Sequence, residues 1–291
     1  MLMVLPKFDY FSCETIEEAC SFLSKYNGDA KILAGGTDLL VKMKHKQVTP
    51  RYLIDIKRVP DLSYIRQDES GGVRIGALTT IQAIKNSPVI KKKFSVLNQA
   101  ASVLGTRQVR NLATLGGNLC NASPAAECAP ALITLGAKAR VIGVHGERLV
   151  SMEEFFVGPG ETLLQRDEIL TELLMPTLPD STAGVYLKHS TRRVDVAIVG
   201  VGAVITLDGK KCQDIKIALG AVGPTPFRAK KAESILRGQE LSEELLEKVA
   251  EAASAESFPI DDIRGYTDYR RGMVEVLVKE GIKQAATQAR L

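Results

Sequence analysis

Two short glycine segments, each following an apolar run, constrain this chain more than any other feature of its sequence. They are Ala34-Gly35-Gly36-Thr37-Asp38 and Thr114-Leu115-Gly116-Gly117-Asn118. Glycine lets backbone N–H groups turn outward and come close to an anion, and the N-terminus of a following helix adds a favourable dipole. Either segment alone is more typical of an ordinary tight turn. Two of them in one chain favour a site that grips a diphosphate from two sides.

The residues around the first segment predict a strand, a glycine turn and a helix. Residues 31–34 form the apolar run before the turn, and residues 39–43 resume the apolar pattern after it. A further strand predicted at 52–56 completes a βαβ-like unit. Upstream, Thr15 and Glu18 have the spacing of a capping box and predict a helix that ends near Asn27-Gly28.

The middle of the chain predicts a mixed α/β region. Residues 73–78 alternate like a strand, and residues 79–86 predict a short helix that stops before Pro88. Ser123-Pro124 fits an N-cap followed by proline at the first helical position. The helix that starts there would run toward Leu135 and be disturbed at Pro130.

The last third of the chain predicts strands followed by helices. The apolar runs 185–188, 197–207 and 215–221 read as strands, and Asp208-Gly209 is a turn signal between two of them. Ser242 then predicts the N-cap of one helix, and a final helix covers much of 268–288. With 291 residues, the chain is long enough for two or three compact units.

Composition and charge exclude several classes of protein. A 45% hydrophobic content argues against disorder. The longest nearly unbroken apolar stretch, 196–207, is well short of the roughly 20 residues that span a bilayer. The N-terminus lacks the features of a signal peptide, so we expect a cytoplasmic protein. The net charge is only +4, and the basic runs at 91–93 and 42–46 are typical of solvated surface, so nucleic acid is not expected.

The cysteines and histidines do not predict a metal site. Five cysteines and three histidines are dispersed, with no C-x-x-C and no zinc-ligand spacing. The chain also lacks a G-x-G-x-x-G fingerprint after a strand, a P-loop and a recognisable hydrolase motif. We therefore expect the chemistry to come from an organic cofactor.

Five segments together resemble the FAD-binding medium subunit of the molybdenum hydroxylases, the xanthine dehydrogenase and carbon monoxide dehydrogenase family. The resemblance covers nearly the whole chain. The segments are KILAGGTDLL (31–40), RIGALTTI (74–81), TLGGNLCNASPAAE (114–127), DEILTELLMP (167–176) and YLKHSTRRVDVAIV (186–199).

The resemblance implies an α+β chain with a PCMH-type, vanillyl-alcohol-oxidase-like FAD-binding fold. Two α/β subdomains, at 1–57 and 58–177, would hold FAD between them. Residues 178–291 would form a C-terminal domain with a three-stranded antiparallel sheet and helices. The prolines at 176 and 179 also favour a boundary there, because helix and strand signals both lapse.

The resemblance also implies which residues bind FAD. The first glycine segment would wrap the pyrophosphate, and the second would hold it and the flavin side from the opposite wall. Glu127 stands where the family more often has Asp, near the ribitol or ribose hydroxyls, and Leu170 would touch the flavin. The two glycine segments contribute Ile32, Leu33, Ala34, Gly35, Gly36, Thr37, Asp38 and Leu39, and Thr114, Leu115, Gly116, Gly117 and Asn118.

Lys188 matches a family lysine near the flavin ring, where a cation would stabilise the anionic reduced flavin. Tyr186 could cover one flavin face, and packing of its ring in the core is an equally good interpretation. For Arg192, Arg193 and Asp195, a structural ion-pair cluster is favoured over a docking or nicotinamide-site role. For Cys120 and Cys128, burial as small hydrophobic side chains is favoured over a redox role.

The function implied is that of an electron-transfer flavoprotein subunit. The molybdopterin cofactor would lie in a large partner subunit and the [2Fe-2S] clusters in a small one, in a dimer of heterotrimers. FAD would take electrons from the clusters and pass them to NAD⁺, a quinone, oxygen or another carrier. Two alternatives are a free-standing flavin-dependent oxidase of the vanillyl-alcohol-oxidase-like superfamily and an interaction subunit that has lost FAD.

Overall fold

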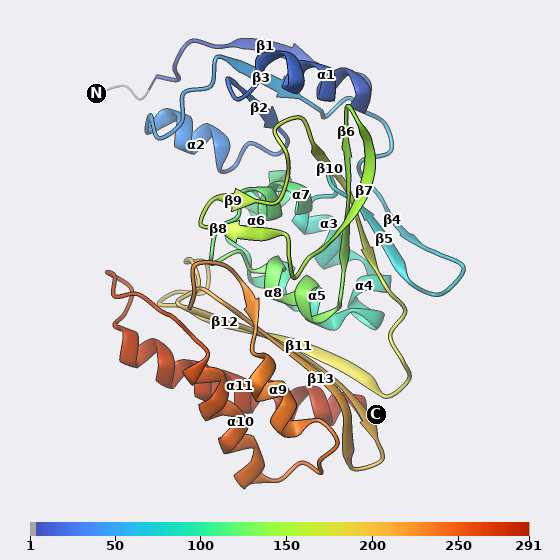
Figure 1. Cartoon of the computed structure of the whole chain (residues 1–291), viewed down its shortest axis with the longest axis vertical. Coiled ribbons are helices and arrows are strands. Elements are labelled where there is room, and N and C mark those ends of the chain that lie inside the picture. Colours follow the sequence, from blue (N-terminus) through green and yellow to red (C-terminus); the bar gives the residue numbers. More distant parts are fainter. Residues whose placement is uncertain (1–3, 291) are drawn as a thin grey trace.

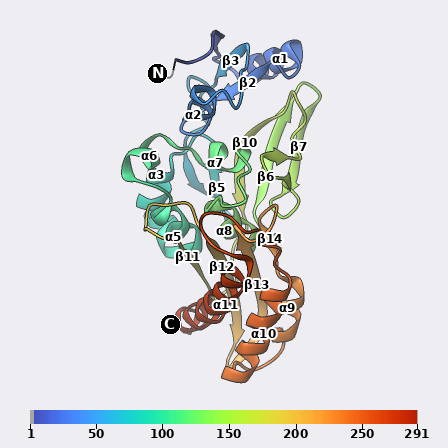
Figure 2. The same cartoon turned by 90° about the vertical axis from the view of Figure 1, so that its left-hand side faces the viewer.

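The computed structural model describes residues 4–290 and stacks three sheet-containing units along its long axis. Figure 1 shows the N-terminal unit at one end and helices α9, α10 and α11 at the other. Figure 2 shows helices α3, α5 and α6 gathered on one side of strands β10, β6 and β7. Among the described residues, no helix combines the length and the apolar character that crossing a bilayer requires.

The N-terminal unit is a parallel three-stranded sheet in the order β1-β3-β2, with β3 pairing both neighbours. The predicted βαβ unit is confirmed. Thr15 caps the first helix by accepting a hydrogen bond from the Glu18 N–H. The edge strand β1 was not predicted, because it is largely exposed and lacks a buried alternating face. The elements are β1 (Asp9–Ser12), α1 (Ile16–Tyr26), β2 (Ala30–Leu33), α2 (Leu39–Lys44) and β3 (Tyr52–Asp55).

The middle unit is an antiparallel five-stranded sheet in the order β4-β5-β10-β6-β7. A separate two-stranded sheet joins β8 and β9. The elements are β4 (Ile65–Gln67), β5 (Val73–Gly76), α3 (Ile81–Asn86), α4 (Pro88–Lys93), α5 (Ser95–Val103), α6 (Arg107–Leu112), α7 (Leu115–Cys120), α8 (Cys128–Thr134), β6 (Lys138–Gly143), β7 (Gly146–Ser151), β8 (Phe156–Gly158), β9 (Glu161–Thr162) and β10 (Ile169–Met175).

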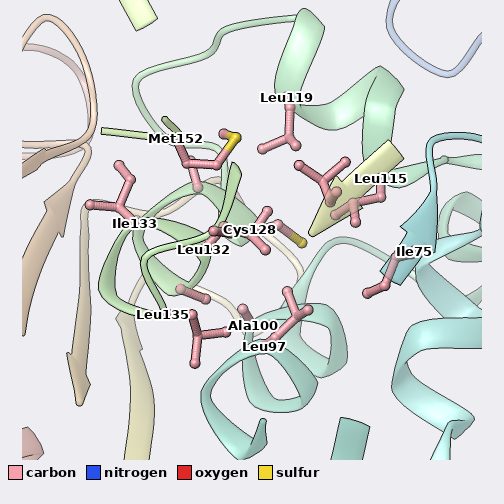
Figure 3. Packing of buried hydrophobic residues seen from close by; sticks show 14 of the residues in the cluster. Ile75, Leu97, Ala100, Leu115, Leu119, Cys128, Leu132, Ile133, Leu135 and Met152 are labelled. Carbon is pink, nitrogen blue, oxygen red and sulfur yellow. The ribbon is translucent and has the colours of Figure 1, made fainter. Parts of the chain in front are cut away.

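Helix α8 forms the centre of the middle core. Figure 3 shows Cys128 and Leu132 of this helix between Leu97 of α5 and the pair Leu115 and Leu119 of α7. All five side chains are essentially inaccessible to solvent. Burying a leucine side chain contributes about 1.5–3 kcal/mol, so this cluster fixes α7 against the rest of the unit.

Two predictions in this region are corrected. The second glycine segment is not a turn but the start of helix α7, with Thr114 as its N-cap. Helix α8 begins at Cys128 rather than after Ser123-Pro124, where the Ser123 hydroxyl accepts from the Ala125 N–H within a turn. Pro130 therefore occupies the first helical turn, where no intrahelical N–H bond is lost, and the helix continues undisturbed through it.

The C-terminal unit is an antiparallel sheet in the order β11-β12-β13-β14. The three predicted strands are confirmed, and the two-residue β14 is an addition. Figure 1 shows α9, α10 and α11 on one face of this sheet and α5 and α8 on the other. The elements are β11 (Thr182–His189), β12 (Val199–Asp208), β13 (Lys211–Gly220), β14 (Phe227–Arg228), α9 (Lys230–Leu236), α10 (Glu243–Ala255) and α11 (Thr267–Ala289).

Candidate functional site

A cavity of about 530 Å³ is lined by residues of all three units and holds most of the predicted site. This volume lies within the range of roughly 300–1,000 Å³ typical of small-molecule and cofactor sites. Among the predicted residues, four do not line the cavity: Leu33, Leu115, Tyr186 and Lys188. Those that line it are Ile32, Ala34, Gly35, Gly36, Thr37, Asp38, Leu39, Thr114, Gly116, Gly117, Asn118, Glu127 and Leu170.

The loop between β2 and α2 presents free backbone donors to the cavity. Within residues 4–290, the N–H groups of Gly35, Gly36, Thr37 and Asp38 have no hydrogen-bond acceptor. Gly36 has a φ of +72°, a backbone conformation that favours glycine. Unpaired backbone N–H groups in such a loop are suited to an anion.

The second glycine segment differs, because its backbone donors are already used. The Leu115 N–H donates to the Thr79 carbonyl at 3.0 Å, and the Gly116 N–H donates to the Ala77 carbonyl at 2.8 Å. The next two N–H groups, of Gly117 and Asn118, donate to the hydroxyl and carbonyl of Thr114. This wall of the cavity is therefore a closed backbone surface rather than a second anion cradle.

Close backbone packing explains one glycine in each segment. A β-carbon on Gly35 would overlap the backbone carbonyl of Leu112, at the end of α6. A β-carbon on Gly116 would lie 2.8 Å from the Ala77 side chain. Gly35 brings the N-terminal unit against the middle unit, and Gly116 lets α7 sit against the end of β5. Both glycines build the cavity walls.

Three cavity-lining side chains offer oxygen atoms as acceptors. The Asn118 Oδ1 atom is buried and has no donor among the described residues. The Asp38 side chain is exposed at the cavity and does not cap α2; desolvation raises its pKa, opposed by Lys42. Burial also raises the pKa of Glu127. Of these, the Asn118 Oδ1 is a buried acceptor without a donor among the described residues, which costs free energy that a ligand carrying hydroxyl or N–H groups would recover.

The residues present fit FAD. Its pyrophosphate is an anion suited to the free amides of the β2–α2 loop, and its sugar hydroxyls are donors suited to Asn118 and Glu127. Lys42 adds a positive charge to the cavity wall, where its Nζ donates to the Asn121 Oδ1 at 2.6 Å. The donors and acceptors of the cavity thus complement the pyrophosphate and the sugar hydroxyls of the cofactor.

Lys188 and Tyr186 lie behind the cavity wall, not on it. The Lys188 side chain is 3% exposed, and its Nζ donates to Glu127 Oε1 at 3.0 Å and to the Val103 carbonyl at 3.1 Å. Tyr186 is buried in the middle core, and this burial raises the pKa of its hydroxyl. The core-packing interpretation of Tyr186 thus fits the geometry. In this structure Lys188 contacts Glu127, which lines the cavity, and does not line the cavity itself.

Several cavity residues were not predicted as part of the site. Leu104, Gly105 and Val109 carry no local motif and reach the cavity through the packing of α5 and α6. Val194 and Val196 come from the β11–β12 loop, together with Asp195, whose arginine neighbours Arg192 and Arg193 are exposed. Asp195 forms no ion pair within residues 4–290, so the favoured ion-pair interpretation is not supported there.

The two cysteines near this wall behave differently. Cys128 is fully buried, as predicted. Cys120 is exposed toward the cavity that it lines, so its predicted burial as a small hydrophobic side chain is wrong. Desolvation in the cavity wall raises the pKa of the thiol to about 12. A thiol with that pKa stays protonated and unreactive at neutral pH.

Family comparisons agree with this architecture. The model described as "FAD binding domain in molybdopterin dehydrogenase" matches residues 6–178, and the one described as "CO dehydrogenase flavoprotein C-terminal domain" matches residues 185–285. The chain belongs to the FAD-binding medium subunits of the molybdenum hydroxylases. The predicted family, FAD cofactor and oxidoreductase class are thereby confirmed.

Individual relatives match over nearly their whole length. The glyceraldehyde dehydrogenase medium chain of Sulfolobus acidocaldarius is 35% identical, over 98% of this chain and 100% of that one. The carbon monoxide dehydrogenase medium chain of Hydrogenophaga pseudoflava is 34% identical, over 97% of this chain and 98% of that one.

Solved structures confirm the predicted fold class. A chain of carbon monoxide dehydrogenase from Hydrogenophaga pseudoflava superposes with a TM-score of 0.95 at 34% identity, covering 98% of this chain and 99% of that one. A chain of quinoline 2-oxidoreductase from Pseudomonas putida 86 gives a TM-score of 0.93 at 30% identity, covering 99% of this chain and 100% of that one.

Proposed function

We propose that this chain is the FAD-binding electron-transfer subunit of a heteromeric molybdenum hydroxylase. Its FAD takes electrons from [2Fe-2S] clusters in a small partner subunit, while substrate is oxidised at a molybdopterin cofactor in a large partner subunit. The electrons then pass to NAD⁺ or another acceptor. The similarity to medium chains over nearly the full length supports this proposal.

The observation that carries the proposal is that one cavity has free backbone donors on one wall and side-chain acceptors on another. The amides of residues 35–38 bind the pyrophosphate, and Asn118 and Glu127 accept from the sugar hydroxyls. Leu170, an apolar cavity residue on β10, packs against the flavin. When bound, FAD supplies the ability to exchange electrons one or two at a time.

The two glycine segments have unequal roles in this proposal. The first segment binds the anion through its amides. The second segment supplies a smooth wall, because Gly116 and Gly117 carry no side chain and their N–H groups are occupied. The wall excludes water on that side and places Asn118 at the end of the closed surface.

A partner-binding surface is also proposed on the C-terminal unit. Four large apolar side chains between α10 and α11 are exposed: Phe258, Ile260, Ile263 and Tyr266. The segment that carries them is anchored, because Arg270 is buried and donates to the Ala221 carbonyl and to Asp262. Clustered apolar exposure on a rigid support is typical of a protein interface.

The three-unit division at residues 57 and 177, the dimer of heterotrimers and the cytoplasmic location belong to the same proposal. The experiment is co-expression with the genes for a large and a small hydroxylase subunit, followed by purification through a tag on the large subunit. Co-purification of this chain with FAD, iron and molybdenum supports the proposal. A flavin-free chain that does not bind either subunit refutes it, and alcohol turnover by the isolated chain favours a free-standing oxidase.

A further inference from the structure

Lys42 and Asn121 form a hydrogen bond that crosses from the N-terminal unit to the middle unit at the cavity wall. Lys42 belongs to α2, and Asn121 is the C-cap residue of α7. The Lys42 Nζ donates to the Asn121 Oδ1 at 2.6 Å, and both residues line the cavity. Both residues are half-buried. The contact therefore holds the ammonium group at the cavity wall.

The charged side chains of the cavity leave a bound pyrophosphate short of cations. Among the described residues, Lys31 and Lys42 are the two lysines or arginines that line the cavity, and Lys31 is exposed on β2. Carboxylates are more numerous than these lysines. Those that line the cavity are Asp38, Glu127, Glu168 and Asp195. Lys42 is therefore the cavity cation that is partly shielded from water, where its charge is screened less.

The charge of Lys42 is not committed to a carboxylate. In the described part of the chain it forms no ion pair, and its one hydrogen bond goes to the neutral amide oxygen of Asn121. An ammonium group has three donors, so further donors remain for a ligand. The Asp38 carboxyl feels this charge, because desolvation raises its pKa and Lys42 opposes the rise. The ammonium thus acts on the loop whose free amides, at 35–38, are suited to an anion.

We propose that Lys42 supplies the counter-charge for the pyrophosphate of FAD, with Asn121 holding its ammonium at the cavity wall. The inference rests on the proposed FAD site and adds a residue outside the two glycine segments. Backbone N–H groups carry no net charge, so a pyrophosphate bound by amides alone keeps its full negative charge in a desolvated cavity, which costs free energy. A charge-assisted hydrogen bond from a lysine offsets that cost.

Titration of the full-length, deflavinated chain with FAD, followed by flavin fluorescence, tests the inference. Lys42→Met weakens FAD binding by roughly 10- to 100-fold, as expected for the loss of one charge-assisted hydrogen bond. Lys44→Met is the matched control, because Lys44 lies on the same helix, is exposed and does not line the cavity. The control keeps FAD affinity within about threefold, since water and salt screen its charge. Equal losses in the two variants would overturn the inference.

The salt dependence of FAD binding distinguishes a charge pair from a loss of packing. Raising the NaCl concentration from about 0.05 to about 0.5 M weakens FAD binding to the wild type, because salt screens the attraction between lysine and pyrophosphate. The salt dependence is smaller in Lys42→Met. Lys42→Arg keeps both the salt dependence and, within a few-fold, the affinity. A Lys42→Met variant with the salt dependence of the wild type contradicts the inference.

A purely structural link between the two units is the alternative explanation of the same contact. Asn121→Ala removes the amide acceptor and leaves the ammonium in the chain, so FAD affinity falls less than in Lys42→Met. Thermal melting of the deflavinated variants measures their stability. If both variants lower FAD affinity and melting temperature equally, the contact is structural and the inference is wrong. A wild-type chain that binds no FAD would instead refute the proposed function, so the two failures are distinguishable.

Discussion

Gly35 and Leu112 meet backbone to backbone. A β-carbon on Gly35 would lie 2.8 Å from the Leu112 carbonyl carbon, a separation that side-chain rotation cannot relieve. Leu112 ends α6, and its side chain is 62% exposed, so this contact depends on backbone and not on side-chain packing. The backbone contact between the N-terminal and middle units at Gly35 and Leu112 therefore requires glycine at position 35.

We predict that Gly35→Ala displaces the β2–α2 loop and lowers FAD occupancy at least tenfold, because the loop amides no longer face the opposite cavity wall. Absorbance of released flavin measures the loss. Gly272→Ala on α11 is the matched control, because a β-carbon there meets no atom within 4 Å. Equal flavin occupancy in both variants would contradict the role assigned to the contact between Gly35 and Leu112.

Thr114→Ala should destabilise the chain by about 1 kcal/mol, the usual cost of a lost N-cap. The Thr114 hydroxyl accepts from the Gly117 N–H at 3.1 Å, and its loss frees that amide in the cavity wall. Buried Leu115 and Leu119 keep α7 in place. Urea denaturation measures the change, and Thr114→Ser should restore most of it; no difference between Ala and Ser would exclude the cap.

Asn118→Leu should weaken FAD binding without lowering the stability of the FAD-free chain. Within residues 4–290, the buried Oδ1 of Asn118 has no partner to lose, whereas a bound hydroxyl would lose its acceptor, at about 1–3 kcal/mol. Titration with FAD and thermal melting of the deflavinated chain separate the two effects. A large drop in the melting temperature with unchanged FAD affinity would show that Asn118 is structural.

Cys120 should resist alkylation near neutral pH although it is exposed to the cavity. Desolvation raises its thiol pKa to about 12, so the reactive thiolate forms only as the pH approaches that value. Iodoacetamide labelling of the deflavinated chain followed by mass spectrometry checks this, with the urea-unfolded chain as the control. Rapid labelling of Cys120 in the folded chain at pH 8 would disprove its desolvation.

Ile263→Asp should weaken the proposed association with partner subunits. Ile263 is fully exposed on the segment between α10 and α11, so the change costs the isolated chain little stability. Pull-down through the tagged large subunit measures the loss. Val276→Asp on α11 is the control, because Val276 is also exposed, at 56%, but lies outside that segment. Equal recovery of both variants would remove the segment from the interface.

Local sequence signals predicted the parts of the fold that local interactions determine. The βαβ unit around Gly36 and the three C-terminal strands follow from apolar periodicity and turn residues. Strand β1 could not be predicted, because it is defined by pairing with the distant β3. The start of α8 was misplaced, because Ser123 and Pro124 have the residue types of a helix start but form only a turn before Cys128.

The cavity residues that belong to the glycine segments were predicted. The cavity residues that tertiary packing brings there were not. Residues 32–39 carry a motif, whereas Gly105 and Val109 reach the cavity because α6 packs beside it. Among the described residues, the backbone N–H groups are free in the first glycine segment and hydrogen-bonded in the second. This difference depends on partners distant in the sequence, the carbonyls of Ala77 and Thr79. Lys188 was predicted beside the flavin, whereas its contact with Glu127 depends on tertiary packing and has no local sequence signal.

The most direct test of the central claim is the flavin content of the complex purified through the large subunit, compared between the wild type and Gly36→Val. Gly36 has a φ of +72° in the free-amide loop, which a β-branched residue cannot adopt without strain. We predict stoichiometric FAD in the wild type, and iron and molybdenum without FAD in the variant. Full FAD occupancy in the variant, or a wild-type complex without FAD, would contradict the account.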